Sequence, residues 1–166
     1  MSPLIEIKHK MTGAVLRAVD APGLAGADLS GADLSGAELK RAILTRARFQ
    51  SAVLREADLS FAMLDRARLE QADLSGARLV SCGLIAANLA GADLSGANLH
   101  HANLYQADLT RARLIGARLT GVDFTEAVLD EADVTGAAFD RQTRWPPRFD
   151  PLAHGAVEQT QQPEKE

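Results

Sequence analysis

Residues 26–39 read GADLSGADLSGAEL, in which a five-residue unit, Ala-Xaa-Leu-Xaa-Xaa, follows itself without a break. The unit continues in the same register from Ala27 to Phe139, which gives 23 repeats. Its first residue is Ala in 21 of them, with Cys82 and Val122 as the exceptions, and its third residue is Leu in 19. A period this strict makes the array the feature that decides the fold.

The five-residue period excludes both long helices and long strands. In a helix, five residues advance an apolar stripe by about 140°, so the stripe would wind around the helix and face no single core. In a strand, each step of five residues would move Leu to the opposite face. Ala and Leu lie two residues apart, however, and point to the same side of a short extended segment. Pairs such as Ser30-Gly31 are typical of turns, so the sequence predicts a chain that coils with Ala and Leu inward.

The stretch at 26–39, together with QADLSGARL at 71–79 and GADLSGANLHHANL at 91–104, resembles the pentapeptide-repeat family. The resemblance implies that family's all-β fold, a right-handed quadrilateral (square) parallel β-helix solenoid in which four repeats form one coil. By that implication the 23 repeats form nearly six coils. A spacing of about 4.8 Å between coils then gives a rod of roughly 28 Å.

The N-terminal flank is expected to cap the array, because a solenoid otherwise exposes open backbone at its ends. Residues 1–21 are predicted to form this cap as a β-hairpin. Ile5 and Ile7 alternate as in a strand, and the turn residues Thr12-Gly13 follow them. The β-helix itself is placed at 22–141.

The C-terminal flank is expected to cap the other end. Residues 142–156 contain three prolines, which favour a rigid segment that folds Trp145 and Phe149 over the last coil. Residues 157–166 are polar and are expected to be disordered. Both flanks are similar to segments that border the array in some members of the family.

Composition limits the classes of partner. The 166 residues are 46% hydrophobic but only 4% aromatic, which indicates a narrow, repetitive core. The net charge of -4 opposes broad binding of nucleic acid or of an acidic membrane, although a local basic patch is compatible with it. The single cysteine excludes an internal disulfide and a Cys-based zinc site. No long apolar run is present, so a cytoplasmic protein without a membrane span is expected.

Motifs that could carry chemistry are better explained by the repeat. Glycines spaced five apart, such as Gly26 and Gly31, match part of a phosphate-binding loop, but the required Lys-Ser/Thr does not follow. His100 and His101 could form a metal pair, yet adjacent outward positions on a turn are expected to point apart. Cys82 occupies an inward Ala position and is interpreted as core. We therefore expect no enzyme, no cofactor and no metal site.

If four repeats form a coil, every fourth repeat lies on the same face. One face is then acidic, interrupted by Arg55 and Arg113, and its candidate partner-binding residues are Asp33, Asp73, Asp93 and Asp133. The next face is basic and includes His100 and His101. A third face shows outward apolar residues, which form a second candidate partner site, namely Ile43, Met63, Ile85 and Tyr105.

Two functions fit these patterns. The first is a non-catalytic scaffold that binds an unidentified protein through its outward faces, as a monomer or an end-to-end homodimer. The alternative comes from the resemblance, since some members of the family resemble B-form DNA, bind DNA gyrase or another topoisomerase and give resistance to fluoroquinolones. A mimic of about 28 Å would need on the order of 16 negative charges with few positive ones. The repeat region has 16 acidic but also 12 basic residues, which favours the scaffold.

Overall fold

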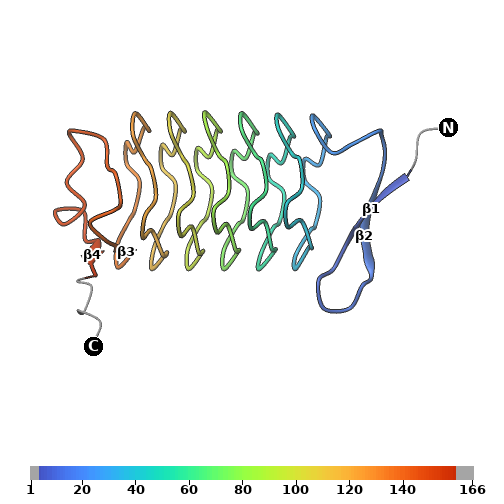
Figure 1. The fold of residues 1–166 in the computed structure, drawn as a ribbon, viewed down its shortest axis with the longest axis horizontal. Coiled ribbons are helices and arrows are strands. Elements are labelled where there is room, and N and C mark those ends of the chain that lie inside the picture. The colour runs from blue at the N-terminus through green and yellow to red at the C-terminus, as the bar shows by residue number, and fades with distance from the viewer. Residues whose placement is uncertain (1–3, 160–166) are drawn as a thin grey trace, which may run out of the picture.

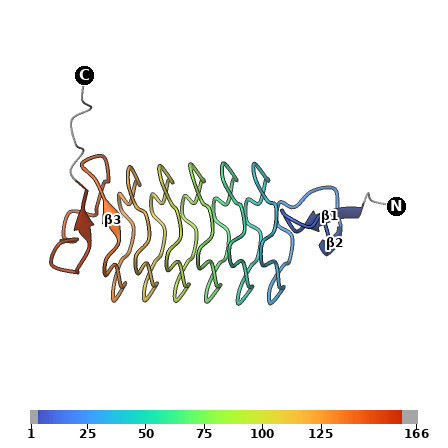
Figure 2. The same ribbon diagram turned by 90° about the horizontal axis from the view of Figure 1, so that it is seen from below.

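The chain forms a rod of stacked coils with a separate element at each end (Figures 1 and 2). The structure is a computed structural model that describes residues 4–159. Its strands are β1 (Leu4–Lys8), β2 (Val15–Asp20), β3 (Ala138–Phe139) and β4 (Val157–Glu158). Between β2 and β3 the backbone pairs through single parallel bridges. Across residues 4–159 no helix has the length and apolar character needed to cross a bilayer.

Each coil contains 20 residues, because the parallel bridges join residues 20 apart. Asp28 pairs with Arg48, Arg48 with Arg68, and the series continues to Arg118 and Ala138. At each bridge two backbone hydrogen bonds join neighbouring coils. The amide of Leu29 donates to the carbonyl of Arg48 at 2.8 Å, and the amide of Arg48 donates back to the carbonyl of Ala27 at 2.9 Å. Twenty residues are four repeats, which agrees with the coil that the resemblance implies.

A tight turn closes every repeat. The amide of Ala32 donates to the carbonyl of Leu29 at 3.2 Å, and the residue before it, Gly31, has a φ of 65°. The same position has a φ between 53° and 69° in all 23 turns from Gly26 to Gly136. A positive φ at this position of a turn favours glycine. Fourteen of the 23 residues are nevertheless not glycine, so the stacked backbone imposes the conformation on them.

The core is the interior of the rod. From Ala47 to Phe139 every Ala and Leu position of the repeat is buried, and Phe49 and Phe124 fit into the Leu stack without exposure. The expected inward direction of Ala and Leu is therefore confirmed. Cys82 is buried in this interior as expected, and its thiol donates to the carbonyl of Ala62 at 3.3 Å.

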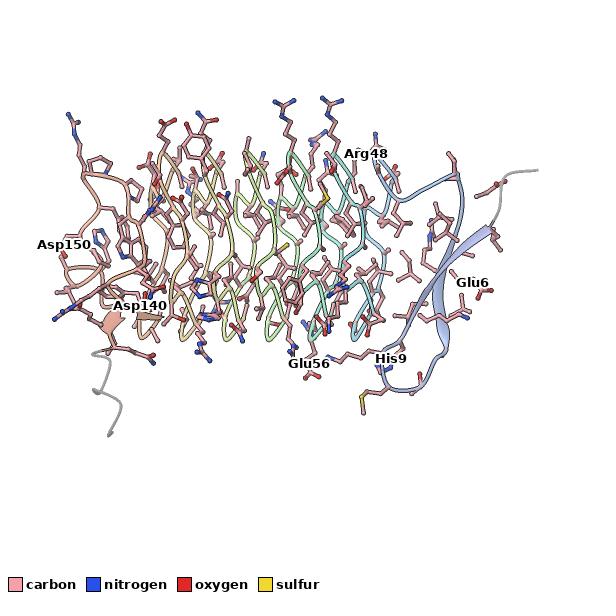
Figure 3. All side chains as sticks on the ribbon, viewed as in Figure 1. Glu6, His9, Arg48, Glu56, Asp140 and Asp150 are labelled. Atoms are coloured by element: carbon pink, nitrogen blue, oxygen red, sulfur yellow. The ribbon has the colours of Figure 1, made fainter. Side chains whose placement is uncertain are left out.

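The N-terminal element consists of β1 and β2, which pair antiparallel with Leu4 opposite Asp20. The segment after β1 bonds to the first coil, with Lys10 N–H donating to Gly36 O and Glu38 N–H to Lys8 O, both at 2.8 Å. Lys10 Nζ reaches further and donates to the carbonyl of Glu56. Figure 3 shows His9 and Glu56 at this same edge of the molecule.

The C-terminal segment covers the last coil with aromatic side chains. Trp145 stacks on Phe124 with ring centroids 4.8 Å apart and on Phe149 at 5.1 Å, and it meets the edge of Phe139. These contacts place Trp145 and Phe149 over the end of the core. The Trp145 indole and the Phe149 ring thus shield apolar surface that the next coil would otherwise cover.

The expected disorder from residue 157 is wrong for its first residues. Val157–Glu158 form β4, which pairs parallel with β3. Val157 N–H donates to Ala137 O at 2.8 Å, and Gln159 N–H donates to Phe139 O at 2.7 Å. The last coil offers unpaired carbonyls at its open edge, and this short strand satisfies two of them. Residues 160–166, the rest of the expected tail, lie outside the described residues.

Candidate protein-docking faces

The residue before each inward Leu has a structural task. Ser35 N–H donates to Asp33 Oδ1 at 3.0 Å, and Tyr105 N–H donates to Asn103 Oδ1 at 3.0 Å. Every Asp and Asn at this position accepts the amide two residues later in the same way, which is an Asx turn: Asp28, Asp33, Asp58, Asp73, Asn88, Asp93, Asn98, Asn103, Asp108, Asp123 and Asp133. This role of the aspartates was not predicted from the sequence. The available signal was Asp followed two residues later by Ser or Thr, which holds for all eight aspartates of this set.

The four aspartates of the expected acidic face lie in one row along the rod. Parallel bridges run from Asp33 through Val53, Asp73, Asp93 and Arg113 to Asp133. The two arginines of this face point at the aspartates, because Arg55 Nε lies 2.5 Å from Asp73 Oδ2 and Arg113 Nη1 lies 2.8 Å from Asp93 Oδ2. Two of the four carboxylates are therefore neutralised within the face.

Hydrogen bonds lower the pKa of three aspartates of this face, Asp33, Asp73 and Asp133, and so favour their charged form. The Ser35 hydroxyl and amide lower the pKa of Asp33. For Asp73, burial acts to raise the pKa, but hydrogen bonds from Ser75 and Arg55 outweigh burial and lower it. A carboxyl with a lowered pKa is a poor general acid, so these groups serve the turns and the surface charge.

The four apolar candidates lie on one face but in two rows. Ile43 and Met63 are bridge partners at the position before Leu, and both are exposed, at 59% and 49%. Ile85 and Tyr105 lie in the next two coils at the position after Leu, where both are half-buried. The structure thus separates Ile43 and Met63 from the other two by their exposure. The carboxylate of Glu126 raises the pKa of the Tyr105 phenol.

The histidines do not point apart, which corrects the expectation. The rings of His100 and His101 are in contact, with centroids 3.9 Å apart. His101 has a φ of 58°, so the turn folds its ring back onto the preceding residue. His100 Nδ1 lies 2.7 Å from Thr120 Oγ1, and burial lowers the pKa of His100. Among residues 4–159 no three His, Cys, Asp or Glu side chains are grouped closely enough to hold a metal ion.

The other sequence motifs are absorbed by the coil. Gly26, Gly31 and Gly36 belong to three successive turns of the array, each with a positive φ, and do not form one loop. Burial raises the pKa of the Cys82 thiol, which keeps it protonated and unreactive at neutral pH. The glycines are thus turn residues, and Cys82 is a core residue.

Comparison with known proteins agrees with this architecture. The family model described as Pentapeptide repeats matches the chain in eight copies, over residues 24–60, 52–82, 77–114 and 107–141. Among solved structures, the pentapeptide repeat protein alr5209 from Nostoc Pcc 7120 is 39% identical with a TM-score of 0.61, and the match covers 61% of this chain and 84% of that one. No curated protein matches the chain.

Two further structures carry printed roles of their own. HetL from Nostoc sp. Strain PCC 7120, described as involved in heterocyst differentiation regulation, is 28% identical with a TM-score of 0.36, covering 81% of each chain. QnrB1, described as a plasmid-mediated fluoroquinolone resistance protein, is 20% identical with a TM-score of 0.48, covering 80% of this chain and 79% of its own. At these values neither role carries over to this chain.

Proposed function

This chain belongs to the pentapeptide-repeat family, and on that premise we propose that it is a non-catalytic scaffold that binds a protein partner through the outward faces of that family's right-handed, square β-helix. Its inward positions are filled by Ala, Leu and Phe, so the residues available for binding are the outward ones. The candidate face is the row of Ile43 and Met63 with Ile85 and Tyr105 in the following coils. The cytoplasmic location and the choice between a monomer and an end-to-end homodimer stay predictions from the sequence.

One observation carries the proposal. Asp or Asn at the position before Leu satisfies the amide two residues later, but Ile43 and Met63 occupy that position without this hydrogen bond and expose apolar surface. Neither the turn nor the core benefits from these two side chains. Exposed apolar residues that stack in adjacent coils are typical of surfaces that bind another protein.

Modulation of DNA gyrase is the alternative. It would use Asp33, Asp73, Asp93 and Asp133 in place of a row of phosphates. The ion pairs of Arg55 with Asp73 and of Arg113 with Asp93 speak against it, because they leave fewer free negative charges than a phosphate row has.

Affinity capture with three forms of the full chain tests the proposal. The wild type is compared with Met63→Ser/Tyr105→Ser and with a variant in which Asp33, Asp73, Asp93 and Asp133 are all replaced by Asn. Asn still accepts the turn hydrogen bond, so the second variant should fold. We expect the same protein to be captured by the wild type and the Asn variant and lost by the Ser variant.

A gyrase supercoiling assay, with and without ciprofloxacin, separates the alternative. We expect no effect of the purified protein in either condition. Inhibition of supercoiling, or its rescue from the quinolone, that disappears in the Asn variant would replace the scaffold with the gyrase modulator.

A further inference from the structure

Three exposed apolar side chains lie close together along the chain or across adjacent coils near the N-terminal end of the rod. Ile43 and Met63 are bridge partners, and Phe61 lies two residues before Met63 at the preceding turn. Phe61 is 48% exposed, similar to its two neighbours. We call Ile43, Phe61 and Met63 the apolar cluster. The sequence analysis did not single out Phe61, because the turn position lies on the corner between two faces.

None of the three side chains of the apolar cluster stabilises the coil in the way that Asp, Asn or Gly does at the equivalent positions. Ile43 and Met63 replace the Asp or Asn that would accept a turn amide. Phe61 has a φ of 62°, a conformation that is unfavourable for a bulky side chain and that glycine adopts freely. Because about half of the Phe61 side chain is exposed, its burial offsets little of the cost of this backbone conformation. Three exposed apolar side chains in one region, none of which serves the turn or the core, point to contact with something outside the chain.

The apolar cluster is flanked by arginines. The guanidinium of Arg41 lies over the Phe61 ring, 5.8 Å from its centroid. On the opposite corner of the face, Arg46 and Arg66 line a shallow groove with Thr45, Asp65 and Ile85. Within residues 4–159 none of Arg41, Arg46 and Arg66 forms an ion pair, whereas seven other arginines do: Arg48, Arg55, Arg68, Arg78, Arg111, Arg113 and Arg144.

Arg46 and Arg66 occupy the same turn position in adjacent coils, where the backbones are about 4.8 Å apart. Like charges on side chains of adjacent coils repel each other unless an anion lies between them. Elsewhere the same turn position carries opposite charges in adjacent coils. Arg111 forms an ion pair with Glu131 one coil away, with Nε and Oε2 2.9 Å apart. The corner formed by Arg46 and Arg66 therefore lacks a negative partner.

Asp65 does not supply that partner. Its Oδ1 accepts the amide of Ile85 at 3.0 Å, because Gly83 has no side chain to cap its own turn. The turns on the two corners beside the apolar cluster carry four basic residues and one acidic residue. The basic residues are Lys40, Arg41, Arg46 and Arg66, and the acidic residue is Asp65. This region therefore has a local excess of positive charge, although the whole chain has a net charge of -4.

We propose that the apolar cluster and its three arginines bind an acidic protein segment that also carries apolar side chains, a proposal that rests on the scaffold function above. The apolar cluster supplies the desolvated contact from which most affinity arises. Arg41, Arg46 and Arg66 select a partner whose negative charge is concentrated in one segment, because the acidic remainder of the rod repels a broadly acidic surface. Nucleic acid fits less well, because its phosphates make no favourable contact with the apolar side chains of Ile43 and Met63. The acidic remainder of the rod also repels its phosphates.

Selection from a displayed library of short random peptides on the immobilised full-length protein tests this proposal. We expect enrichment of peptides that combine Asp or Glu with Phe, Leu or Met. The enriched peptides, carrying a fluorophore, are then titrated with protein variants by fluorescence polarisation at low and high salt. Binding should weaken by about tenfold or more in Arg46→Glu/Arg66→Glu, and it should also weaken at high salt.

Matched variants keep the readout specific. Arg141→Glu reverses an exposed arginine at the far end of the rod and should leave peptide affinity unchanged. Met63→Asp should abolish binding while restoring an acceptor for the turn amide. Arg46→Ala/Arg66→Ala gives a milder test that introduces no new charge, and the thermal midpoint of every variant reports whether the coil is intact.

The outcomes distinguish this inference from the scaffold itself. Enriched peptides without acidic residues, or acidic peptides that bind Arg46→Glu/Arg66→Glu as tightly as the wild type, overturn the acidic-segment proposal and leave the scaffold in place. Tighter binding of a labelled oligonucleotide than of any enriched peptide overturns it in favour of nucleic acid. A library that yields no binding peptide contradicts both the acidic segment and the scaffold.

Discussion

Asp33 and Ile43 hold equivalent positions in their repeats but act in opposite ways. Asp33 accepts the Ser35 amide at 3.0 Å and completes its own turn. Ile43 offers the Thr45 amide no acceptor and exposes apolar surface instead. At the residue scale, each repeat thus has two fixed inward positions and one outward position where a polar side chain stabilises the turn. Departures at that outward position are where function can be sought.

The inward positions predict a sharp contrast between neighbours. Leu94→Ala should lower the free energy of unfolding by about 2 to 5 kcal/mol, because Leu94 is fully buried and stacked coils cannot collapse into the cavity. Ser95→Ala should change the free energy of unfolding by less than about 0.5 kcal/mol. The Ser95 hydroxyl forms no hydrogen bond, so its removal costs none. Urea unfolding of both variants measures the difference. Equal shifts would contradict the inward and outward assignment.

The elements at the two ends solve the same problem with different chemistry. The first coil receives backbone hydrogen bonds from the segment after β1, through Lys8 and Lys10. The last coil receives aromatic cover from Trp145 and a parallel strand, β4. An open coil exposes both unpaired backbone and apolar side chains, so each end needs hydrogen bonds and apolar contact together.

Trp145 is expected to dominate the C-terminal cap. Trp145→Ala should lower the free energy of unfolding by about 3 kcal/mol, because the indole contacts three aromatic rings at the end of the core. Leu152→Ala is the matched control, since Leu152 lies in the same segment but is exposed. Thermal unfolding of both variants, with light scattering to detect association, provides the measurement. A stable, monodisperse Trp145→Ala protein would show that the segment is not a cap.

At the scale of the whole molecule, charge is distributed as local pairs along a rod. Ion pairs such as Arg113 with Asp93 join adjacent coils along the direction in which the coils stack. On the surface each such pair contributes little alone. The aspartates whose pKa lies below its usual value are spread over the whole rod: Asp28, Asp33, Asp58, Asp73, Asp123, Asp133 and Asp140.

Acid should therefore destabilise the rod as a whole. The Arg48 hydrogen bond lowers the pKa of Asp28 from 3.8 to about 2. Because the folded state has the lower pKa, the stabilisation is complete above the unfolded value and is lost as pH falls from about 4 to about 2. Thermal midpoints between pH 6 and 2 should show this loss, and replacing Asp28, Asp33, Asp73 and Asp133 by Asn should reduce it. An identical acid profile in the Asn variant would contradict the assignment.

The coil and its inward positions could be predicted from the five-residue period alone, because Ala and Leu can share one side only if the chain turns at every repeat. The pattern is local and occurs in 23 repeats, so a single exception such as Cys82 does not hide the period. The cap by Trp145 was predictable for a related reason, since the array must end against something apolar.

The contacts between outward side chains could not be predicted from the repeat, because they depend on how the coils stack. Asp65 caps the turn that Gly83 leaves open, β4 completes the last coil, and Arg41 lies over the Phe61 ring. These contacts depend on side-chain direction at turns with a positive φ and on pairing between residues about 20 apart in sequence. A periodic sequence specifies which repeats share a face, but the direction of each outward side chain is fixed by its neighbours in the stacked coils, because nothing in the repeat itself constrains it.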